Sequence, residues 1–328
     1  MAGHLFEVDN LNIEFRRSDD KVYAVNGVSF SIGEGGTLGI VGESGSGKSV
    51  TMMSCIGLIR SNGTVKAGTA KFEGHDLLKM NRKQLEHIRG LEIGVIFQDP
   101  MTSLNPLMRI GDQIMEGMIE HHYATPRDAF DRTINLLGEM GIPEPKTRFR
   151  NYPHEFSGGM RQRIMIAMAL ACEPKLLIAD EPTTALDVTV QMQILALLKE
   201  QQEKKNMSIA MITHDFGVAT NFCDKIVVLY AGQVMEVAET KEFIRRPAHP
   251  YTIGLKNSII EVGQRDRALK PIPGMAPTLT SPPTSCSFAD RCPLVTDRCR
   301  SELPVLRQVD ANHMVACHRA EEVLNHAV

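Results

Sequence analysis

One stretch, GESGSGKS at residues 42–49, constrains the fold of this chain more than any other feature. Two glycines enclose four residues, and a lysine and a serine follow, which is the full phosphate-loop pattern. In such a loop the backbone curls until many N–H groups point at one anion, and glycine permits both the curl and the close approach. The pattern therefore predicts a loop that binds the phosphate groups of a nucleoside triphosphate.

The sequence on either side of the loop supports this interpretation. An apolar run at residues 37–41 is typical of a buried strand, and residues 50–58 are compatible with a helix. A helix that begins near Lys48 directs the positive end of its dipole at the anion. The alternative is a chance glycine-serine loop, and the flanking strand and helix argue against it. We expect nucleotide contacts from Gly42, Glu43, Ser44, Gly45, Ser46, Gly47, Lys48, Ser49 and Val50.

Other polar side chains fit the same chemistry, with Lys48 on the β- and γ-phosphates and Ser49 on Mg²⁺. Apolar runs that read as buried strands precede both Gln98 and the pair Asp180-Glu181. Gln98 could be a simple polar cap, but beside a phosphate loop it can supply an oxygen to Mg²⁺. A lone Asp-Glu pair is a weak signal; here it ends an apolar strand 132 residues beyond Lys48. Asp180 is then expected to hold a Mg²⁺-bound water and Glu181 to polarise the attacking water.

Three further features are ambiguous when each is taken alone. Ser157 is a good N-cap for an apolar helix at residues 164–171, and two glycines follow it. Tyr23 could present its ring to a nucleotide base, although an ordinary half-buried strand tyrosine is the simpler interpretation. His214 ends an apolar run at residues 208–213, where a structural hydrogen bond is as common as a catalytic role.

The order of these motifs along residues 5–240 resembles the nucleotide-binding subunits of ABC transporters. The ordered set is Tyr23, the phosphate loop, Gln98, Ser157-Gly158-Gly159, Asp180-Glu181, Asp187 and His214. The Ser-Gly-Gly signature is specific to this class, and Met160 stands where the general pattern has glutamine. Longer stretches are similar to the dipeptide/oligopeptide importer ATPases: FQDPMTSLNP at 97–106, FSGGMRQR at 156–163 and RPAHPYT at 246–252. Importers of glutathione, murein peptide and nickel are close relatives, so they remain alternatives.

The resemblance implies that two such subunits close head to tail over two ATP molecules. Tyr23 would stack on adenine, and the phosphates and Mg²⁺ would be held by Lys48, Ser49, Gln98 and Asp180. Glu181 would activate water, and His214 would contact the γ-phosphate. The signature residues Ser157, Gly158 and Gly159 would serve the ATP of the opposite subunit, and Asp187 would link the two sites.

The resemblance also implies partners and a location. We expect a heterodimer with a second, homologous ATPase, two permease subunits and an extracytoplasmic solute-binding protein, with the chain peripheral on the cytoplasmic face of the inner membrane. The net charge of −3 gives no electrostatic reason to expect nucleic acid. The start of the chain lacks the form of a signal peptide, and no apolar run approaches the roughly 18 residues that span a bilayer. Competing interpretations are a soluble ABC-type ATPase acting on DNA or ribosomes, and a non-catalytic regulatory subunit.

A cysteine-rich tail follows a proline-rich stretch at residues 263–285 that reads as an extended linker. Its four cysteines are separated by five, six and seventeen residues, wider than the tight pairs of most zinc sites: Cys286, Cys292, Cys299 and Cys317. Four thiolates in a short loop-like tail suit one metal centre. The peptide-importer resemblance points to a [4Fe–4S] cluster; zinc, or no metal, remains an alternative. His313 or His318 could replace a ligand.

The predicted fold class is α/β, a phosphate-loop NTPase core of the ABC type. It carries an antiparallel β subdomain, in which residues 5–15 would be an edge strand, a helical insertion at about 101–165 and the cysteine-rich C-terminal extension. The expected domains are the nucleotide-binding domain at 1–240, a linker at 241–285 and a metal-cluster region at 286–328.

Overall fold

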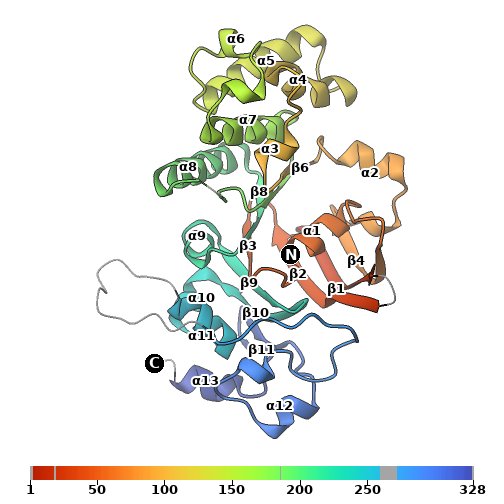
Figure 1. The fold of residues 1–328 in the computed structure, drawn as a ribbon, viewed down its shortest axis with the longest axis vertical. Helices are drawn as coiled ribbons and strands as arrows, with labels where there is room; N and C mark the ends of the chain where they lie inside the picture. The colour runs from red at the N-terminus through yellow and green to blue at the C-terminus, as the bar shows by residue number, and fades with distance from the viewer. Residues whose placement is uncertain (1–2, 18–19, 185, 259–271, 327–328) are drawn as a thin grey trace. The chain divides into compact units, whose positions relative to one another are not determined.

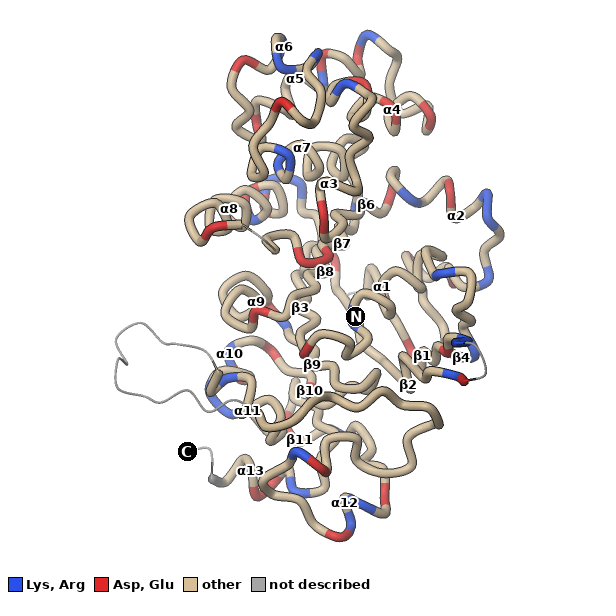
Figure 2. Tube along the Cα trace, in the orientation of Figure 1, with Lys and Arg blue, Asp and Glu red and all other residues tan. Residues whose placement is uncertain are grey.

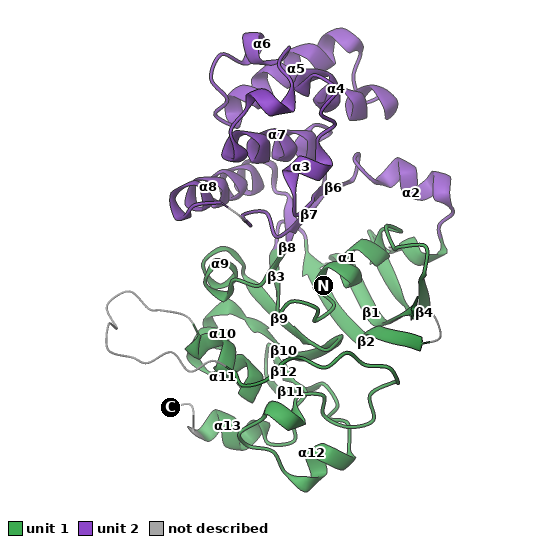
Figure 3. Cartoon of the chain, in the orientation of Figure 1, with its two compact units in different colours: residues 1–33, 37–79, 212–328 green, residues 34–36, 80–211 purple. Residues whose placement is uncertain are grey.

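The computed structural model describes residues 3–17, 20–184, 186–258 and 272–326 (Figure 1). The chain divides into two compact units (Figure 3). Unit 1 comprises residues 1–33, 37–79 and 212–328, and unit 2 comprises residues 34–36 and 80–211. The phosphate loop and the cysteine tail therefore belong to unit 1, whereas the Asp-Glu pair and the Ser-Gly-Gly signature belong to unit 2. The domain boundaries expected at residues 240 and 285 stay predictions.

Unit 1 contains an antiparallel sheet with strand order β2-β1-β4-β5. Its strands are β1 (His4–Arg17), β2 (Asp20–Gly33), β4 (Gly63–Phe72) and β5 (His75–Asp76). The prediction that residues 5–15 form an edge strand was wrong, because β1 pairs with β2 on one side and with β4 on the other. The alternation of apolar residues shows which face is buried and carries no information on how many neighbours a strand has.

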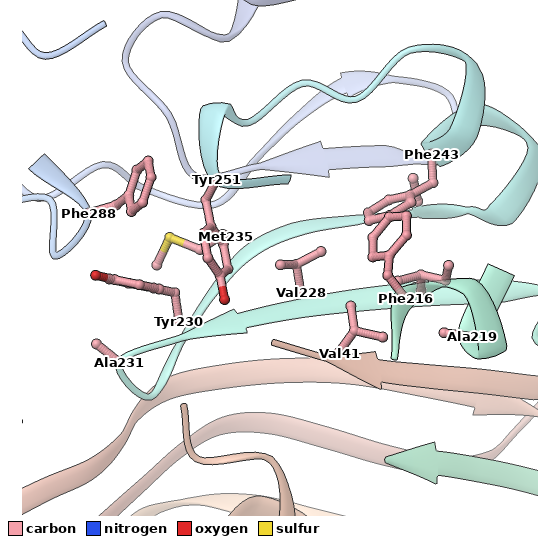
Figure 4. Close-up of a cluster of buried hydrophobic side chains, with 12 residues drawn as sticks. Val41, Phe216, Ala219, Val228, Tyr230, Ala231, Met235, Phe243, Tyr251 and Phe288 are labelled. Atoms are coloured by element: carbon pink, nitrogen blue, oxygen red, sulfur yellow. The ribbon is translucent and has the colours of Figure 1, made fainter. Parts of the chain in front are cut away.

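A second group of strands in unit 1 carries the phosphate loop, in the order β11-β12-β10-β9-β3. The strand β3 (Thr37–Val41) is buried along its whole length and parallel to β9 (Lys225–Tyr230). The predicted hairpin is confirmed, because β9 and β10 (Gln233–Glu239) pair antiparallel. The helices of unit 1 include α1 (Lys48–Cys55), α9 (Phe216–Phe222), α10 (Thr240–Arg245) and α11 (Pro250–Asn257). Apolar side chains from these elements form one buried cluster (Figure 4).

Unit 2 combines three strands with a largely helical segment. The strands β6 (Ile93–Ile96) and β7 (Leu176–Asp180) are parallel, and the last two residues of β8 (Ser208–Thr213) pass into unit 1. Among the described residues, every regular element between residues 100 and 170 is helical, as expected for this segment. The helices are α2 (Arg82–Ile88), α3 (Pro100–Ser103), α4 (Ile110–Glu120), α5 (Pro126–Glu139), α6 (Pro145–Arg148), α7 (Gly158–Leu170) and α8 (Val188–Lys205). The short 3₁₀ turn η2 (Pro153–Glu155) also belongs to unit 2, whereas η1 (Leu77–Lys79) belongs to unit 1.

The tail contains more regular structure than the sequence pattern indicates. Its elements are η3 (Ala289–Arg291), α12 (Asp297–Ser301), β11 (Arg307–Asp310), β12 (His313–Val315) and α13 (Ala320–His326). β12 pairs antiparallel with β10, so the tail extends the sheet that carries the phosphate loop. Of the predicted linker, residues 263–271 lie outside the described residues. The part at 272–285 has no regular element, and the Tyr23 N–H donates to the Leu279 carbonyl at 2.9 Å, which ties it to β2.

Charged residues of both signs are scattered along the described trace (Figure 2), in keeping with the small net charge. Within the described residues, none of the helices has the length and apolar character needed to span a bilayer.

One buried carboxylate connects the tail to the sheet of unit 1. Glu236 on β10 is fully buried. Its oxygens accept hydrogen bonds from the backbone N–H groups of Ala248 (2.8 Å) and His249 (2.9 Å) and lie 2.7 Å from His313 Nε2. We predict that Glu236→Ala lowers the free energy of unfolding by about 2–4 kcal/mol, because it leaves buried donors without an acceptor. A fall in melting temperature of about 5 °C or more would report this loss.

The matched control for that variant is Glu239→Ala at the end of the same strand. Glu239 is exposed and accepts one hydrogen bond, from Asn312 Nδ2 at 2.8 Å. Its melting temperature should stay close to that of the wild type. Equal losses in the two variants would contradict a special role for Glu236.

Candidate functional site

The phosphate loop has a backbone shape that only glycine adopts easily at three positions, Gly42, Gly45 and Gly47. β3 ends at Val41, and α1 begins at Lys48. Gly42 has φ of 152°, and a Cβ there would lie 2.1 Å from the Leu229 carbonyl oxygen. Gly47 has φ of 98°, and its Cβ would lie 2.6 Å from a neighbouring backbone oxygen, that of Ala24. The two enclosing glycines of the motif are thus required by the turn and by close backbone packing.

Lys48 lies inside the curl of the loop. Its side-chain ammonium donates to the carbonyl oxygens of Gly42 (2.8 Å) and Glu43 (2.9 Å), and the residue is only 5% exposed. Ser44 and Gly45 are exposed at the tip of the loop, whereas Ser46 is buried. The positive charge predicted for phosphate binding therefore sits at the first turn of α1, where the helix dipole has the same sign.

Ser49 and Val50, which follow the phosphate loop, line a different cavity from the one that Tyr23 lines. Ser49 and Val50 line a cavity of about 520 Å³ together with Val22 and Ala24 of β2. Tyr23 lines another cavity, of about 440 Å³, because successive residues of a strand point to opposite faces. The expected contact of Tyr23 with adenine stays a prediction.

In unit 2 the structure brings Gln98 and Glu181 together. Asp180 is buried at the end of β7, and Glu181 follows with a positive φ of 48°. The Oε2 atom of Glu181 accepts hydrogen bonds from Gln98 Nε2 (3.0 Å) and from Thr184 Oγ1 (2.8 Å). A non-glycine residue in the left-handed region costs about 1–3 kcal/mol and is typical of functional positions. These contacts hold the Glu181 carboxylate in one orientation, as a residue that orients water requires.

The signature residues begin α7, and Asp187 begins α8. Ser157 Oγ accepts from the Met160 N–H at 3.4 Å, which confirms the predicted N-cap. Asp187 Oδ1 accepts from the Val190 N–H at 2.9 Å. Ser157, Gly158 and Asp187 are all exposed on unit 2. Their backbone and side chains are therefore accessible to a second molecule, as their expected roles require.

Sequence reasoning missed one residue that connects the signature helix to the carboxylate pair. Gln162 on α7 is 2% exposed, and its Nε2 donates to the Pro182 carbonyl, one residue beyond Glu181, at 2.6 Å. A glutamine close to the apolar run of this helix was the signal that could have identified it.

The remaining predicted site residues are divided between the units. His214 is exposed in unit 1, directly after β8 and next to Asp215, which caps α9. Of the three expected Mg²⁺ ligands, Ser49 belongs to unit 1, whereas Gln98 and Asp180 belong to unit 2.

The four tail cysteines line one small enclosed cavity of about 10 Å³. Backbone N–H groups point at two of the sulfurs, from Leu294 to Cys292 Sγ and from Arg319 to Cys317 Sγ, each at 3.4 Å. Burial raises the pKa of Cys286 and of Cys317 to about 11. The thiols would therefore stay protonated at neutral pH unless a cation stabilised the thiolate form.

These cysteines do not form a ready-made single-ion site. Among the residues that the structure describes, no three His, Cys, Asp or Glu side chains are arranged to hold a metal ion. The structure places the predicted set Cys286, Cys292, Cys299 and Cys317 in the wall of one cavity, and the expected metal binding stays a prediction.

One neighbour of the cysteines, His249, has a free hydrogen-bond donor that suits a group bound to the sulfurs. His249 also lines the cavity, and its Nδ1 accepts from the Tyr251 N–H at 3.0 Å. Burial lowers the pKa of His249 to about 3, so the ring is neutral and its proton is on Nε2. This N–H is buried and finds no acceptor among the described residues. A donor without a partner next to four cysteines is suited to an anionic sulfur acceptor.

Comparisons with known proteins agree with this arrangement. Residues 25–184 match the family "ABC transporter", and residues 235–299 match "Oligopeptide/dipeptide transporter, C-terminal region". The chain is 46% identical to the oligopeptide transport ATP-binding protein OppD of Salmonella typhimurium, over 98% of this chain and 96% of that protein. It is 45% identical to the dipeptide transport ATP-binding protein DppD of Bacillus subtilis, over 99% and 97% of the two chains.

Solved structures show the same fold for the nucleotide-binding part. A dimeric ATP-binding cassette, MJ0796, in a post-hydrolysis state bound to ADP and Pi, superposes with a TM-score of 0.65 at 27% identity, covering 72% of this chain and 98% of that one. CbiO1 from Clostridium perfringens, part of the ABC transporter complex CbiONQ, gives a TM-score of 0.62 at 29% identity, covering 73% of this chain and 90% of that one. The chain therefore belongs to the family of ATP-binding subunits of oligopeptide and dipeptide ABC transporters.

Proposed function

We propose that this chain binds and hydrolyses ATP to power the uptake of dipeptides or oligopeptides through partner permeases. The observation that carries the proposal is the 46% identity over 98% of the chain to an oligopeptide transport ATP-binding protein. The phosphate loop and the Asp-Glu pair, which such a motor needs, are both present.

In this mechanism each residue acts by binding, orienting or moving a proton. Lys48 leaves the loop carbonyls for the β- and γ-phosphates, whose charge is a stronger acceptor. Asp180 and Gln98 would hold Mg²⁺ and its water. Glu181 takes up the proton of the attacking water, and the hydrogen bond from Gln98 keeps its carboxylate in place.

The remaining roles require a second ATPase subunit. Ser157, Gly158 and Gly159, at the start of α7, are proposed to bind the ATP held by the partner, and Asp187 to link the two sites. His214 is proposed to contact the γ-phosphate and Tyr23 to stack on adenine. Closure on ATP and opening after hydrolysis would drive the permeases, because the γ-phosphate is the group that both subunits bind.

The proposed assembly is a heterodimer with a second ATPase, two permeases and an extracytoplasmic binding protein, at the cytoplasmic face of the inner membrane. The experiment that tests the transported solute is reconstitution with the permeases and binding protein encoded beside this chain. We expect dipeptides or oligopeptides to stimulate ATP hydrolysis. Stimulation by glutathione, murein peptide or nickel alone would contradict the peptide assignment and leave the ATPase assignment standing.

We further propose that the tail cysteines hold a [4Fe–4S] cluster. Two observations support this: the four sulfurs share one cavity, and the His249 Nε2–H faces it without an acceptor. A cluster is larger than one ion, so its cysteine ligands stand further apart than those of zinc. When bound, such a cluster supplies cross-links between the cysteine segments and can carry one electron. The cavity of about 10 Å³ would have to widen as the side chains turn outward.

Glu181→Gln tests the proposed water activation. We predict that in the assembled complex it lowers ATP turnover at least about a hundredfold, because the amide cannot accept the proton, while MgATP still binds. Glu203→Gln, an exposed glutamate on α8, is the control and should hydrolyse ATP like the wild type. Near-normal turnover in the Glu181 variant would remove that residue from its role.

Metal analysis of the full chain tests the cluster. After anaerobic purification we predict a brown protein with about four iron and about four sulfide per chain. Cys292→Ser should lose both the colour and the iron. Cys172→Ser, a buried cysteine of unit 2, is the control that should keep them. A colourless protein that contains zinc, or no metal, would refute the proposal.

A further inference from the structure

The cysteine tail is joined to the phosphate loop by one arginine. Arg291 stands directly before Cys292, and its guanidinium makes two parallel bonds to the Glu43 carboxylate. Nη1 lies 2.8 Å from Oε2, and Nη2 lies 3.0 Å from Oε1. The Arg291 side chain is only 8% exposed, and that of Glu43 is 28% exposed. A bidentate pair shielded from solvent in this way is stronger and more directional than a surface ion pair.

The remaining donors of Arg291 are also used. Its Nε donates to the Pro273 carbonyl at 2.7 Å, and its Nη1 donates to the Tyr230 hydroxyl at 3.2 Å. The guanidinium carbon lies 5.6 Å from the centroid of the Tyr230 ring, within the range of a cation–π contact. Burial alone would lower the pKa of Arg291, but the hydrogen bonds to the Glu43 carboxylate and the Tyr230 hydroxyl outweigh it and hold that pKa above its usual range. Arg291 therefore has one fixed position and carries its charge at every physiological pH.

On the loop side, Glu43 is held through its backbone as well. Its N–H donates to the Tyr251 hydroxyl at 2.9 Å, and its carbonyl accepts from Lys48 Nζ at 2.9 Å. Glu43 is thus the residue at which the loop lysine, the helix α11 and the tail all make contact.

Aromatic packing connects these groups within unit 1. The Tyr230 and Tyr251 ring centroids are 4.8 Å apart, and Phe288 of the tail lies 5.3 Å from each. Figure 4 shows the three rings gathered at one end of the buried cluster. Phe288 lies between Cys286 and Arg291 in the sequence, so the segment that presents the arginine is anchored beside the loop.

We propose that Arg291 is a positioning residue for the phosphate loop: through Glu43 it holds the loop in its nucleotide-binding shape, so that ATP affinity depends on the cysteine tail. This inference rests on the proposed function only in that the loop binds nucleotide. A glycine-rich loop loses conformational freedom when it closes around phosphates, and a loop that is already fixed loses less. Without the pair, part of the binding free energy would be used to order the loop.

The test is a double-mutant cycle in the full chain, with binding of a fluorescent ATP analogue and Mg²⁺ as the readout. The variants are Arg291→Lys, Glu43→Gln and the two together. The lysine keeps the positive charge but cannot make the two parallel hydrogen bonds to the carboxylate. We expect each single variant to raise Kd about five- to fiftyfold. The double variant should be no weaker than the weaker single one, because each change breaks the same contact.

Arg298→Lys is the matched control. Arg298 also makes a bidentate pair in the tail, to Glu302 at 2.7 and 3.0 Å, but this pair is exposed and does not involve the loop. Its Kd should equal that of the wild type. A change in melting temperature alone, with Kd unchanged in the Arg291 and Glu43 variants, would show a merely structural role and overturn the proposal.

Hydrogen exchange in the nucleotide-free chain gives a second readout that does not depend on binding. We expect the amides of residues 43–47 to exchange faster in Arg291→Lys and in Glu43→Gln than in the control. Unchanged exchange, or additive losses in the double variant, would also overturn the proposal. Failure of the proposed function is distinguishable, because then the wild type itself would not bind the analogue, or Lys48→Ala would bind it unchanged.

Discussion

The close approach of two glycines to neighbouring backbone fixes the geometry on which unit 1 is built. Gly42 lies against the Leu229 carbonyl and Gly47 against that of Ala24, at separations that leave no room for a Cβ. These contacts join the loop to β9 and to β2, which are far apart in the sequence. The loop therefore cannot take its shape until both sheets are in place, and the nucleotide site is a product of tertiary structure.

The elements that were predicted well are those whose signal lies within a few consecutive residues. β3 was identified from the mainly apolar run of five residues that it comprises, and the Ser157 N-cap from one hydroxyl before a helix. The edge-strand assignment failed because pairing partners leave no mark in the strand itself. β12, with three residues, is too short for any periodicity to be seen.

The site shows the same division between local and distant information. The phosphate-loop residues and the Asp-Glu pair are local motifs, whereas the bond between Gln98 and Glu181 joins residues 83 positions apart. The contact between Arg291 and Glu43 spans 248 positions. No single sequence reveals such pairs, because either side chain alone is compatible with an ordinary solvated surface.

The pairing of β12 with β10 has a consequence for how this chain is made in the cell. A ribosome releases residues in order, so the outer edge of β10 remains unpaired until His313–Val315 has emerged. During that time the edge can pair with another nascent chain, and Glu236 has no histidine beside it. Biosynthesis of this subunit thus has a late vulnerable interval, in which a holding chaperone or a slow translation rate would alter its yield.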